Sequence, residues 1–188
     1  MLENFYIGKK KIGKNCPTYF IADIAANHDG NLDKALELIH SCAEAGADVA
    51  KFQHFEAETI VSDKGFKDLK NKKSHQSGWK KSIFKTYQEA SLPLHWTKTL
   101  KKECDKAKIL FSTSPYSINL VDYVDKYISF YKIGSGDITW HQIIEKISKK
   151  KKPLVLATGA SSLNEVSLAV KKVEKIKKEY VLMQCNTN

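Results

Sequence analysis

This sequence has few of the residues that build disulfide frameworks, metal clusters or membrane spans. Its four cysteines are scattered with no C-x-x-C pair, which argues against a disulfide framework and against a cysteine-bound metal. No run approaches the ~18 apolar residues of a membrane span, and the first residues lack the basic and then apolar pattern of a signal peptide. We therefore expect a cytoplasmic protein with reduced cysteines.

Acidic residues are in deficit, and the formal net charge is +10. Such an excess can attract nucleic acid or an anionic membrane. The lysines, however, are spread over helix-like segments and one tract, Lys149 to Lys152, and no segment has a pattern that reads a DNA groove. Solvated helix faces are the favoured interpretation, with neither nucleic acid nor membrane as a partner. A non-catalytic basic binding module is the alternative from another class.

Short apolar segments recur along the chain, separated by helix-like segments. They cover residues 19–24, 49–53, 109–112, 154–158 and 180–184, together with the segment that precedes Gly134. Alternation of this kind indicates an α/β fold with parallel strands, and polar residues at the strand ends favour a TIM-type (β/α) barrel. Because a closed barrel has eight βα units, about six strands predict an incomplete barrel, truncated after the sixth strand.

Two domains or subdomains are expected. Residues 1–17 are polar and predict a small N-terminal hairpin or lid, and residues 18–188 form the partial barrel. Helices are predicted over residues 31–46, 94–107, 117–124 and 139–147, and another begins at the capping box Ser162-x-x-Glu165.

The stretch from residue 53 to residue 92 has only weak periodicity and predicts a long loop. His54, His75, Trp79 and Tyr87 could line a site beneath this loop, or the aromatic residues could form a small core of the loop itself.

Charged side chains end several of the predicted strands. A lysine is seldom buried without an anionic partner, so an inward-facing Lys51 predicts a neighbouring carboxylate or a bound anion, and the same holds for Lys132. Asp23 lies within an apolar strand and, as a buried acid, needs a partner. Two lysines on different strands suit a phosphate or carboxylate ligand. The alternative is that each lysine extends out of the barrel end into solvent.

Hydroxyl and amide groups stand at the same level. They are carried by Gln53, Ser114, Ser135, Thr158 and Thr187. Each alone is weak evidence because such residues are common in turns. The segment Asn27-His28-Asp29-Gly30 adds a carboxylate, an amide and an imidazole, although these residues could simply form a turn into the first helix.

Several motifs together resemble the N-acetylneuraminate (sialic acid) synthase family in order and spacing. They are Ile21 to His28, Val49 to Gln53, Ser114 to Ser117, Tyr131 to Gly136, Ala157-Thr158-Gly159 and Gln184-Cys185-Asn186. The resemblance implies that phosphoenolpyruvate is condensed with an N-acetylmannosamine-type (N-acyl hexosamine) sugar, which gives a nine-carbon 2-keto acid and phosphate. A pseudaminic or legionaminic acid synthase, which differs in the sugar, is the alternative within the family.

The resemblance also implies roles for individual residues. Lys51, Ser114, Lys132 and Ser135 match the positions that bind phosphoenolpyruvate, and Gln53, Thr158 and Thr187 are further substrate-binding candidates. Asp23 stands where the family has its catalytic acid, usually a glutamate, and Ala157 replaces a frequent serine.

A divalent metal, Mn²⁺ or Mg²⁺, is implied as a cofactor. Its histidine ligands in the family follow the seventh and eighth strands, so they are expected beyond residue 188, and no metal ligand is assigned within this chain. We therefore expect the chain alone to be inactive, and we expect a homodimer at full length.

Overall fold

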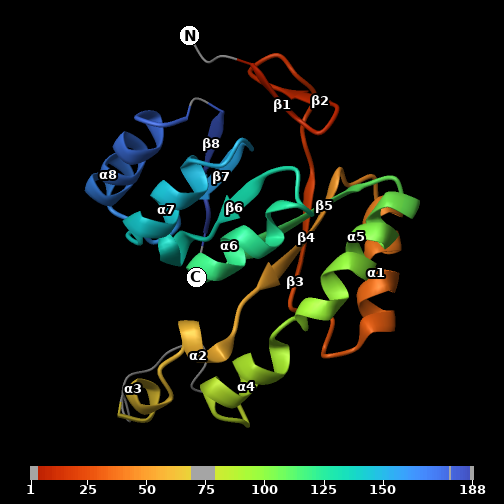
Figure 1. Ribbon diagram of the computed structural model, residues 1–188, viewed down its shortest axis with the longest axis vertical. Helices are drawn as coiled ribbons and strands as arrows, with labels where there is room; N and C mark the ends of the chain where they lie inside the picture. The colour runs from red at the N-terminus through yellow and green to blue at the C-terminus, as the bar shows by residue number, and fades with distance from the viewer. Residues whose placement is uncertain (1–3, 69–78, 178, 187–188) are drawn as a thin grey trace.

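The structure is a computed structural model that describes residues 4–68, 79–177 and 179–186 (Figure 1). The strands are β1 Phe5–Ile7, β2 Lys10–Ile12, β3 Ile21–Ala25, β4 Val49–His54, β5 Leu110–Pro115, β6 Tyr131–Ile133, β7 Leu154–Ala157 and β8 Tyr180–Met183. The α-helices are α1 Leu32–Glu44, α2 Ala57–Ile60, α3 Asp63–Asp68, α4 Ile83–Ala90, α5 Thr97–Lys106, α6 Ile118–Asp125, α7 His141–Ser148 and α8 Leu163–Glu174. Two short 3-10 helices are η1 Leu94–Trp96 and η2 Ser135–Asp137. All six predicted barrel strands are therefore present.

The six barrel strands form two parallel sheets of three, ordered β3-β4-β5 and β6-β7-β8. β5 lies beside β6, but no backbone ladder joins these two described strands. A side-chain hydrogen bond crosses the seam between β5 and β6, since Ser112 Oγ donates to the carbonyl of Phe130 at 3.2 Å. The prediction of an α/β fold with parallel strands is confirmed. The barrel is not closed, because β3 and β8 have no strand partner on their outer edges among the described residues.

Strand alternation decides which side chains face the inside of the curved sheets. Ala50 and Phe52 of β4 belong to the large core that the strands share with the helices. Successive side chains of a strand point to opposite faces, so Val49, Lys51 and Gln53 face inward. The same rule places Ser112 and Ser114 of β5 inward, because they pair in register with Lys51 and Gln53.

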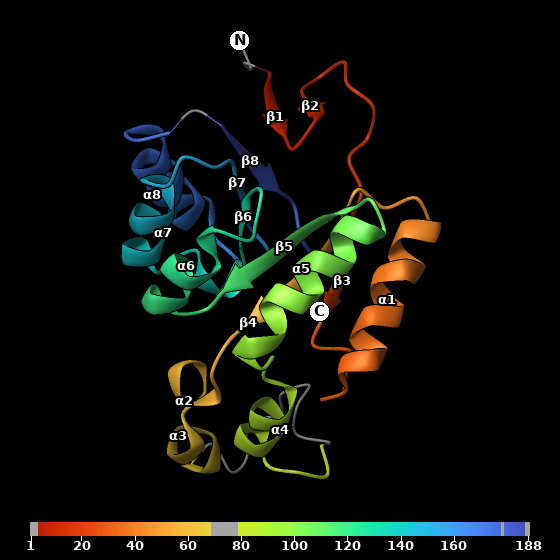
Figure 2. The same cartoon turned by 45° about the vertical axis from the view of Figure 1, so that its right-hand side comes forward.

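Helices α1, α5, α6, α7 and α8 flank the two sheets, whereas α2, α3 and α4 lie beyond the carboxyl end of β4 (Figures 1 and 2). Four of the described helices, α1, α4, α6 and α8, begin at a short polar side chain that accepts a backbone N–H bond. Asn31 caps α1, Ser117 caps α6, and Ser162 forms the predicted capping box with Glu165 at the start of α8. The expected helices from residue 31 onward are thus confirmed, with ends shifted by a few residues.

The first residues form a two-stranded antiparallel hairpin, β1 and β2. Ile7 of the hairpin packs against Val49, Phe130 and Val155, which lie at the amino ends of the barrel strands. Asp48 attaches the hairpin to the sheet, because its carboxylate pairs with Lys10 and also accepts the backbone N–H of Phe20. The hairpin therefore closes the amino end of the strands, opposite to the end at which β4 leads into α2 (Figure 2).

The stretch predicted as a long loop contains the three short helices α2, α3 and α4, so that prediction was wrong in detail. α4 begins at the cap Ser82, and none of its residues is buried. The ring of Tyr87 contacts those of Phe55 and Trp79, with ring centroids 5.7 and 6.3 Å apart, respectively. His75 lies outside the described residues.

Two lysines of the tract pair with acids of a neighbouring helix. Lys150 lies 2.7 Å from a carboxylate oxygen of Asp122 on α6, and Lys152 lies 3.2 Å from one of Asp125. The expected solvated helix end thus describes the exposed Lys149 and Lys151, whereas Lys150 and Lys152 are ion-paired. Among the described helices, none is both long and apolar enough to cross a membrane.

Candidate active site

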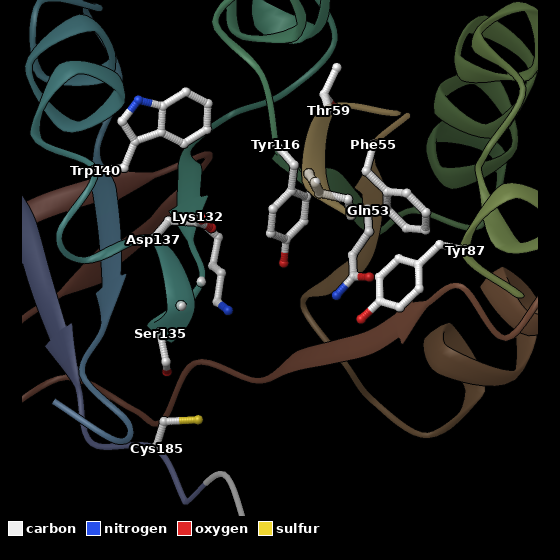
Figure 3. A pocket seen from close by; sticks show the side chains of 13 residues that line it. Gln53, Phe55, Thr59, Tyr87, Tyr116, Lys132, Ser135, Asp137, Trp140 and Cys185 are labelled. Atoms are coloured by element: carbon white, nitrogen blue, oxygen red, sulfur yellow. The ribbon is translucent and has the colours of Figure 1, made fainter. Parts of the chain in front are cut away.

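A cavity of about 610 Å³ opens at the carboxyl ends of the strands (Figure 3). Its described wall consists of Gln53, Phe55, Thr59, Ile60, Tyr87, Tyr116, Lys132, Gly134, Ser135, Gly136, Asp137, Trp140 and Cys185. These residues come from both sheets and from the segment that carries α2 and α4. Three of the predicted site residues, Gln53, Lys132 and Ser135, are therefore in the wall.

The two sides of the cavity differ in chemistry (Figure 3). Lys132, Ser135 and Asp137 supply charged and hydroxyl groups on one side, from β6 and the following η2. Phe55 and Tyr116 face them on the other side, with ring centroids 6.3 Å apart in an edge-to-face arrangement. One side suits an anion, and the other suits the apolar face of a larger organic group.

Lys51 lies close to the first of the predicted acids. Its ammonium is 2.7 Å from Asp23 Oδ1, and the two residues are partners in the β3–β4 register. The Lys51 side chain is 3% exposed, whereas that of Asp23 is 53% exposed. The expected carboxylate partner of Lys51 is thus present, but the expectation that Asp23 is itself buried was wrong. Among the described residues β3 has a strand on only one side, so Asp23 lies on a strand whose other edge is unpaired.

Two buried donors at this level have unused hydrogen-bonding capacity. Lys51 Nζ pairs with Asp23 Oδ1 at 2.7 Å, and no other described group accepts from this nitrogen, which carries three N–H donors. Ser114 Oγ also has no well-formed hydrogen bond among the described residues, although the hydroxyl lies close enough to Tyr116 to lower its pKa. Buried polar groups are nearly always hydrogen-bonded. Lys51 and Ser114 are therefore candidates for binding a ligand.

The electrostatics of the cavity join these groups to Lys132. Burial lowers the pKa of Lys132, the positive charge of Lys51 lowers it further, and Asp23 and Asp137 act in the opposite direction. Burial raises the pKa of Asp137 to about 6, and Lys132 limits the increase. The pKa of the Tyr116 hydroxyl is raised by burial and then by the negative charge of Asp137. The cavity wall thus carries the Lys132 amine and a phenol whose protonated form is favoured, and the charge of Lys51 acts on this wall from beside it.

Gly134 permits a close approach between the strand end and the aromatic side of the cavity. A Cβ at this position would lie 3.1 Å from Tyr116 Oη and 3.3 Å from Asp137 Oδ2. Glycine therefore lets the Tyr116 hydroxyl and the Asp137 carboxylate both lie close to the backbone at this position. The neighbouring Gly136 has nothing within 4 Å of such a Cβ.

The remaining predicted hydroxyls have different surroundings. Ser135 Oγ accepts the backbone N–H of Gly159 at 3.0 Å, so its own proton is free for a ligand. Thr158 Oγ1 donates to the carbonyl of Met183 at 3.0 Å and ties β7 to the end of β8. Thr158 is not among the described residues of the cavity wall. Thr187 lies outside the described residues.

His54 does not line the cavity, contrary to one of the expectations. It follows Gln53 and therefore faces the helices, where its side chain is fully buried. Nδ1 is 2.8 Å from Thr113 Oγ1 and Nε2 is 2.8 Å from Thr97 Oγ1. Because Thr97 donates its own proton to Leu94, it must accept from His54 Nε2–H. Burial lowers the pKa of His54 to about 4, so this histidine is a neutral structural bridge.

The segment after β3 forms a turn, which was the simpler of the two interpretations. The side chain of Asn27 donates to the carbonyl of Ile24, and His28 Nδ1 accepts the N–H of Gly30. Asp29 pairs with Lys34 on α1. These contacts carry the chain from β3 into α1 and leave none of the three side chains in the described cavity wall.

Asp137, Tyr116 and Cys185 line the cavity but were not predicted as site residues. Asp137 belongs to the motif that begins at Lys132, and its position two residues after Ser135 is the signal that could have identified it. The described residues contain no group of three or more His, Cys, Asp or Glu side chains that could hold a metal. The described residues thus do not form a metal centre by themselves.

Known proteins share this architecture. The fold superposes with a TM-score of 0.84 on the crystal structure of the N-acetylneuraminic acid (sialic acid) synthetase of Leptospira borgpetersenii in complex with citrate, at 26% identity, over 100% of this chain and 61% of that one. A truncated 3-deoxy-D-arabino-heptulosonate 7-phosphate synthase from Thermotoga maritima has the same fold, with a TM-score of 0.67, 15% identity and coverage of 96% of this chain and 55% of that one. Both likenesses show that the chain has the α/β fold of these neighbours.

The sequence gives the family. The model of the NeuB family matches residues 38–188, and the chain belongs to that family. It is 32% identical to the N,N'-diacetyllegionaminic acid synthase of Campylobacter jejuni over 174 residues, 90% of this chain and 52% of the relative. It is 29% identical to the human N-acetylneuraminate-9-phosphate synthase over 181 residues, 94% of this chain and 48% of the relative. The chain thus spans about half the length of these curated relatives.

Proposed function

We propose that this chain provides the phosphoenolpyruvate-binding part of a synthase that condenses phosphoenolpyruvate with an N-acetylmannosamine-type sugar. The observation that carries the proposal is the proximity of two lysines from separate sheets. Lys51 is buried, Lys132 is partly buried, and the charge of Lys51 lowers the pKa of Lys132. Two converging ammonium groups suit a ligand with more than one negative group, and phosphoenolpyruvate carries a phosphate and a carboxylate.

In this proposal the reaction consumes one water and releases one phosphate. C3 of phosphoenolpyruvate forms a bond to the aldehyde carbon of the open-chain sugar, water adds at C2, and the C–O bond to phosphate breaks. Lys51 and Lys132 would neutralise the anionic groups, while Ser114 and Ser135 would donate hydrogen bonds to them. Asp137, with a pKa of about 6, could exchange a proton near neutral pH. Asp23 would act where the family has its catalytic acid.

The aromatic side of the cavity would hold the sugar. Phe55, Tyr87 and Tyr116 present ring faces and edges, and Gln53 adds an amide beside them. Rings of this kind pack against the C–H face of a sugar and against acyl methyl groups, while the amide hydrogen-bonds to hydroxyls. The relatives act on different sugars by name, so pseudaminic and legionaminic acid precursors remain alternatives. Turnover of several N-acyl hexosamines by the full-length protein would decide between them.

A divalent metal, Mn²⁺ or Mg²⁺, belongs to this proposal only as a group held by residues outside this chain. The described residues do not fit a complete ligand set, so no step is assigned to the metal here. We accordingly propose that the chain alone has no synthase activity, and that the full-length protein is a homodimer. Phosphate release from phosphoenolpyruvate, N-acetylmannosamine and Mn²⁺ at a rate well above that of Lys51→Ala would overturn the first statement.

Calorimetric titration of phosphoenolpyruvate into the chain tests the binding site directly. Lys132→Met removes one of the two charges and should weaken binding roughly tenfold or more. Lys98→Met is the matched control, because Lys98 is an exposed lysine on α5 and makes no contact with the cavity wall. Equal affinities of the wild type and Lys132→Met would refute the proposed function.

A further inference from the structure

Lys51 and Asp23 form an unequal pair. The ammonium is almost completely enclosed, with 3% of the Lys51 side chain exposed, whereas 53% of the Asp23 side chain is in contact with solvent. Lys51 sits in the middle of β4 between register partners on both neighbouring strands. If the pair opens, the carboxylate is therefore the group that has room to move.

The pair is also incomplete. Asp23 balances the charge of Lys51 at 2.7 Å, and no other described group accepts from the remaining N–H donors of this nitrogen. Ser114 is 1% exposed, and its Oγ likewise lacks a well-formed hydrogen bond among the described residues. Ser114 is two residues beyond Ser112, the register partner of Lys51, so both donors lie on the inner face of adjacent strands. An oxyanion between them would satisfy both donors.

We propose that Asp23 is a resident counter-ion of Lys51, which an incoming oxyanion, a phosphate or a carboxylate group, replaces. This inference rests on the proposed function, because it concerns the same anion site. Asp23 holds the charge of Lys51 in the empty site and competes with the ligand for it. Binding of the anion releases the Asp23 carboxylate toward the solvent-exposed side, where it becomes available to a second substrate. No covalent bond changes in this exchange.

The neighbouring charges support an exchange rather than simple addition. Lys132 is close enough for the charge of Lys51 to lower its pKa, and Asp23 and Asp137 both counteract this effect. The empty site thus contains two cations and two anions. A ligand that arrives with two or more negative charges would leave the site with an excess of negative charge unless a carboxylate withdraws. Asp23 is the more exposed of the two carboxylates and is the one paired with Lys51.

Isothermal titration with inorganic phosphate, at constant ionic strength, tests this exchange in the 188-residue chain. Asp23→Asn keeps the shape of the side chain and removes its charge, so phosphate should bind about fivefold tighter. This gain should disappear when Lys51→Met is added, because the competition requires the lysine. Asp29→Asn removes the same charge from an exposed residue paired with Lys34, and should change the affinity less than twofold.

The outcomes separate this inference from the proposed function. Unchanged or weaker binding by Asp23→Asn, while Lys51→Met still loses phosphate, would overturn the counter-ion role and leave the anion site intact. A gain that persists in the Lys51→Met background, or that Asp29→Asn reproduces, would show a general charge effect and would also overturn it. Absence of phosphate binding in both the wild type and Asp23→Asn would refute the anion site itself. Asp23→Ser carries the same expectation if the asparagine variant fails to fold.

Discussion

Replacing Asp137 by asparagine should stabilise the folded chain at neutral pH. Burial raises the pKa of this carboxyl from 3.8 to about 6. Each unit by which the pKa rises corresponds to about 1.4 kcal/mol, so the full cost of ionising the carboxylate in the folded chain is about 3 kcal/mol. Asp137 is only partly enclosed, and solvent screening reduces the expected cost to about 1–2 kcal/mol. Asparagine resembles the protonated acid and avoids this cost.

The sign of the effect gives a pH window. Well below pH 4 the carboxyl is protonated in both the folded and unfolded chain, and the variant should equal the wild type in stability. Between about pH 4 and 6 the folded chain holds its proton more strongly, so the wild type loses stability relative to Asp137→Asn as the pH rises. Above pH 6 the difference should be constant.

Urea unfolding followed by circular dichroism at several pH values from 4 to 8 measures this difference. Asp68→Asn is the control, since Asp68 is an exposed aspartate at the end of α3. A stability difference for Asp137→Asn that is absent at pH 7, or the same at pH 4 and pH 7, would refute the reasoning that burial of this carboxylate is costly.

Two further substitutions test the geometry around the site. Gly134→Ala places a methyl group 3.1 Å from Tyr116 Oη, so phosphoenolpyruvate should bind several-fold more weakly by calorimetry while Gly136→Ala, which meets no atom, binds normally. His54→Leu leaves the buried hydroxyl of Thr113 without its partner, and should lower the unfolding free energy in urea by about 2–4 kcal/mol. Adding Thr113→Val should recover part of this loss, and a purely additive loss would contradict the proposed bridge.

The strands were predictable because their signals are local. Each barrel strand is a short apolar run that ends in small or polar residues, and the capping box at Ser162 marks a helix start by itself. The segment of α2 to α4 was missed because its helices bury few side chains and are held by contacts between aromatic residues far apart in the sequence. Periodicity cannot detect such contacts.

The candidate site was predictable to the level of strand ends and no further. Lys51 and Lys132 were identifiable because buried lysines require compensation. The exposure of Asp23 depends on the missing neighbour of β3, which no local pattern encodes. His54 was misplaced by a single position along β4, since alternation turns it away from Gln53 and toward the helices. Asp137 and Tyr116 line the same part of the cavity because Gly134 has no side chain and leaves room for both.

The seam between β5 and β6 has a mechanical consequence. Lys51 and Ser114 belong to one sheet, whereas Lys132 lies in β6 of the other sheet and Ser135 follows that strand. In the part of the chain that the structure describes, no backbone ladder joins β5 to β6, and a side-chain bond runs from Ser112 to Phe130. A ligand bound by residues of both sheets would restrict the motion of one sheet relative to the other. Ligand binding would therefore also make the contact between β5 and β6 more rigid. Slower hydrogen exchange along β5 and β6 would then report occupancy of a cavity that neither strand fully encloses.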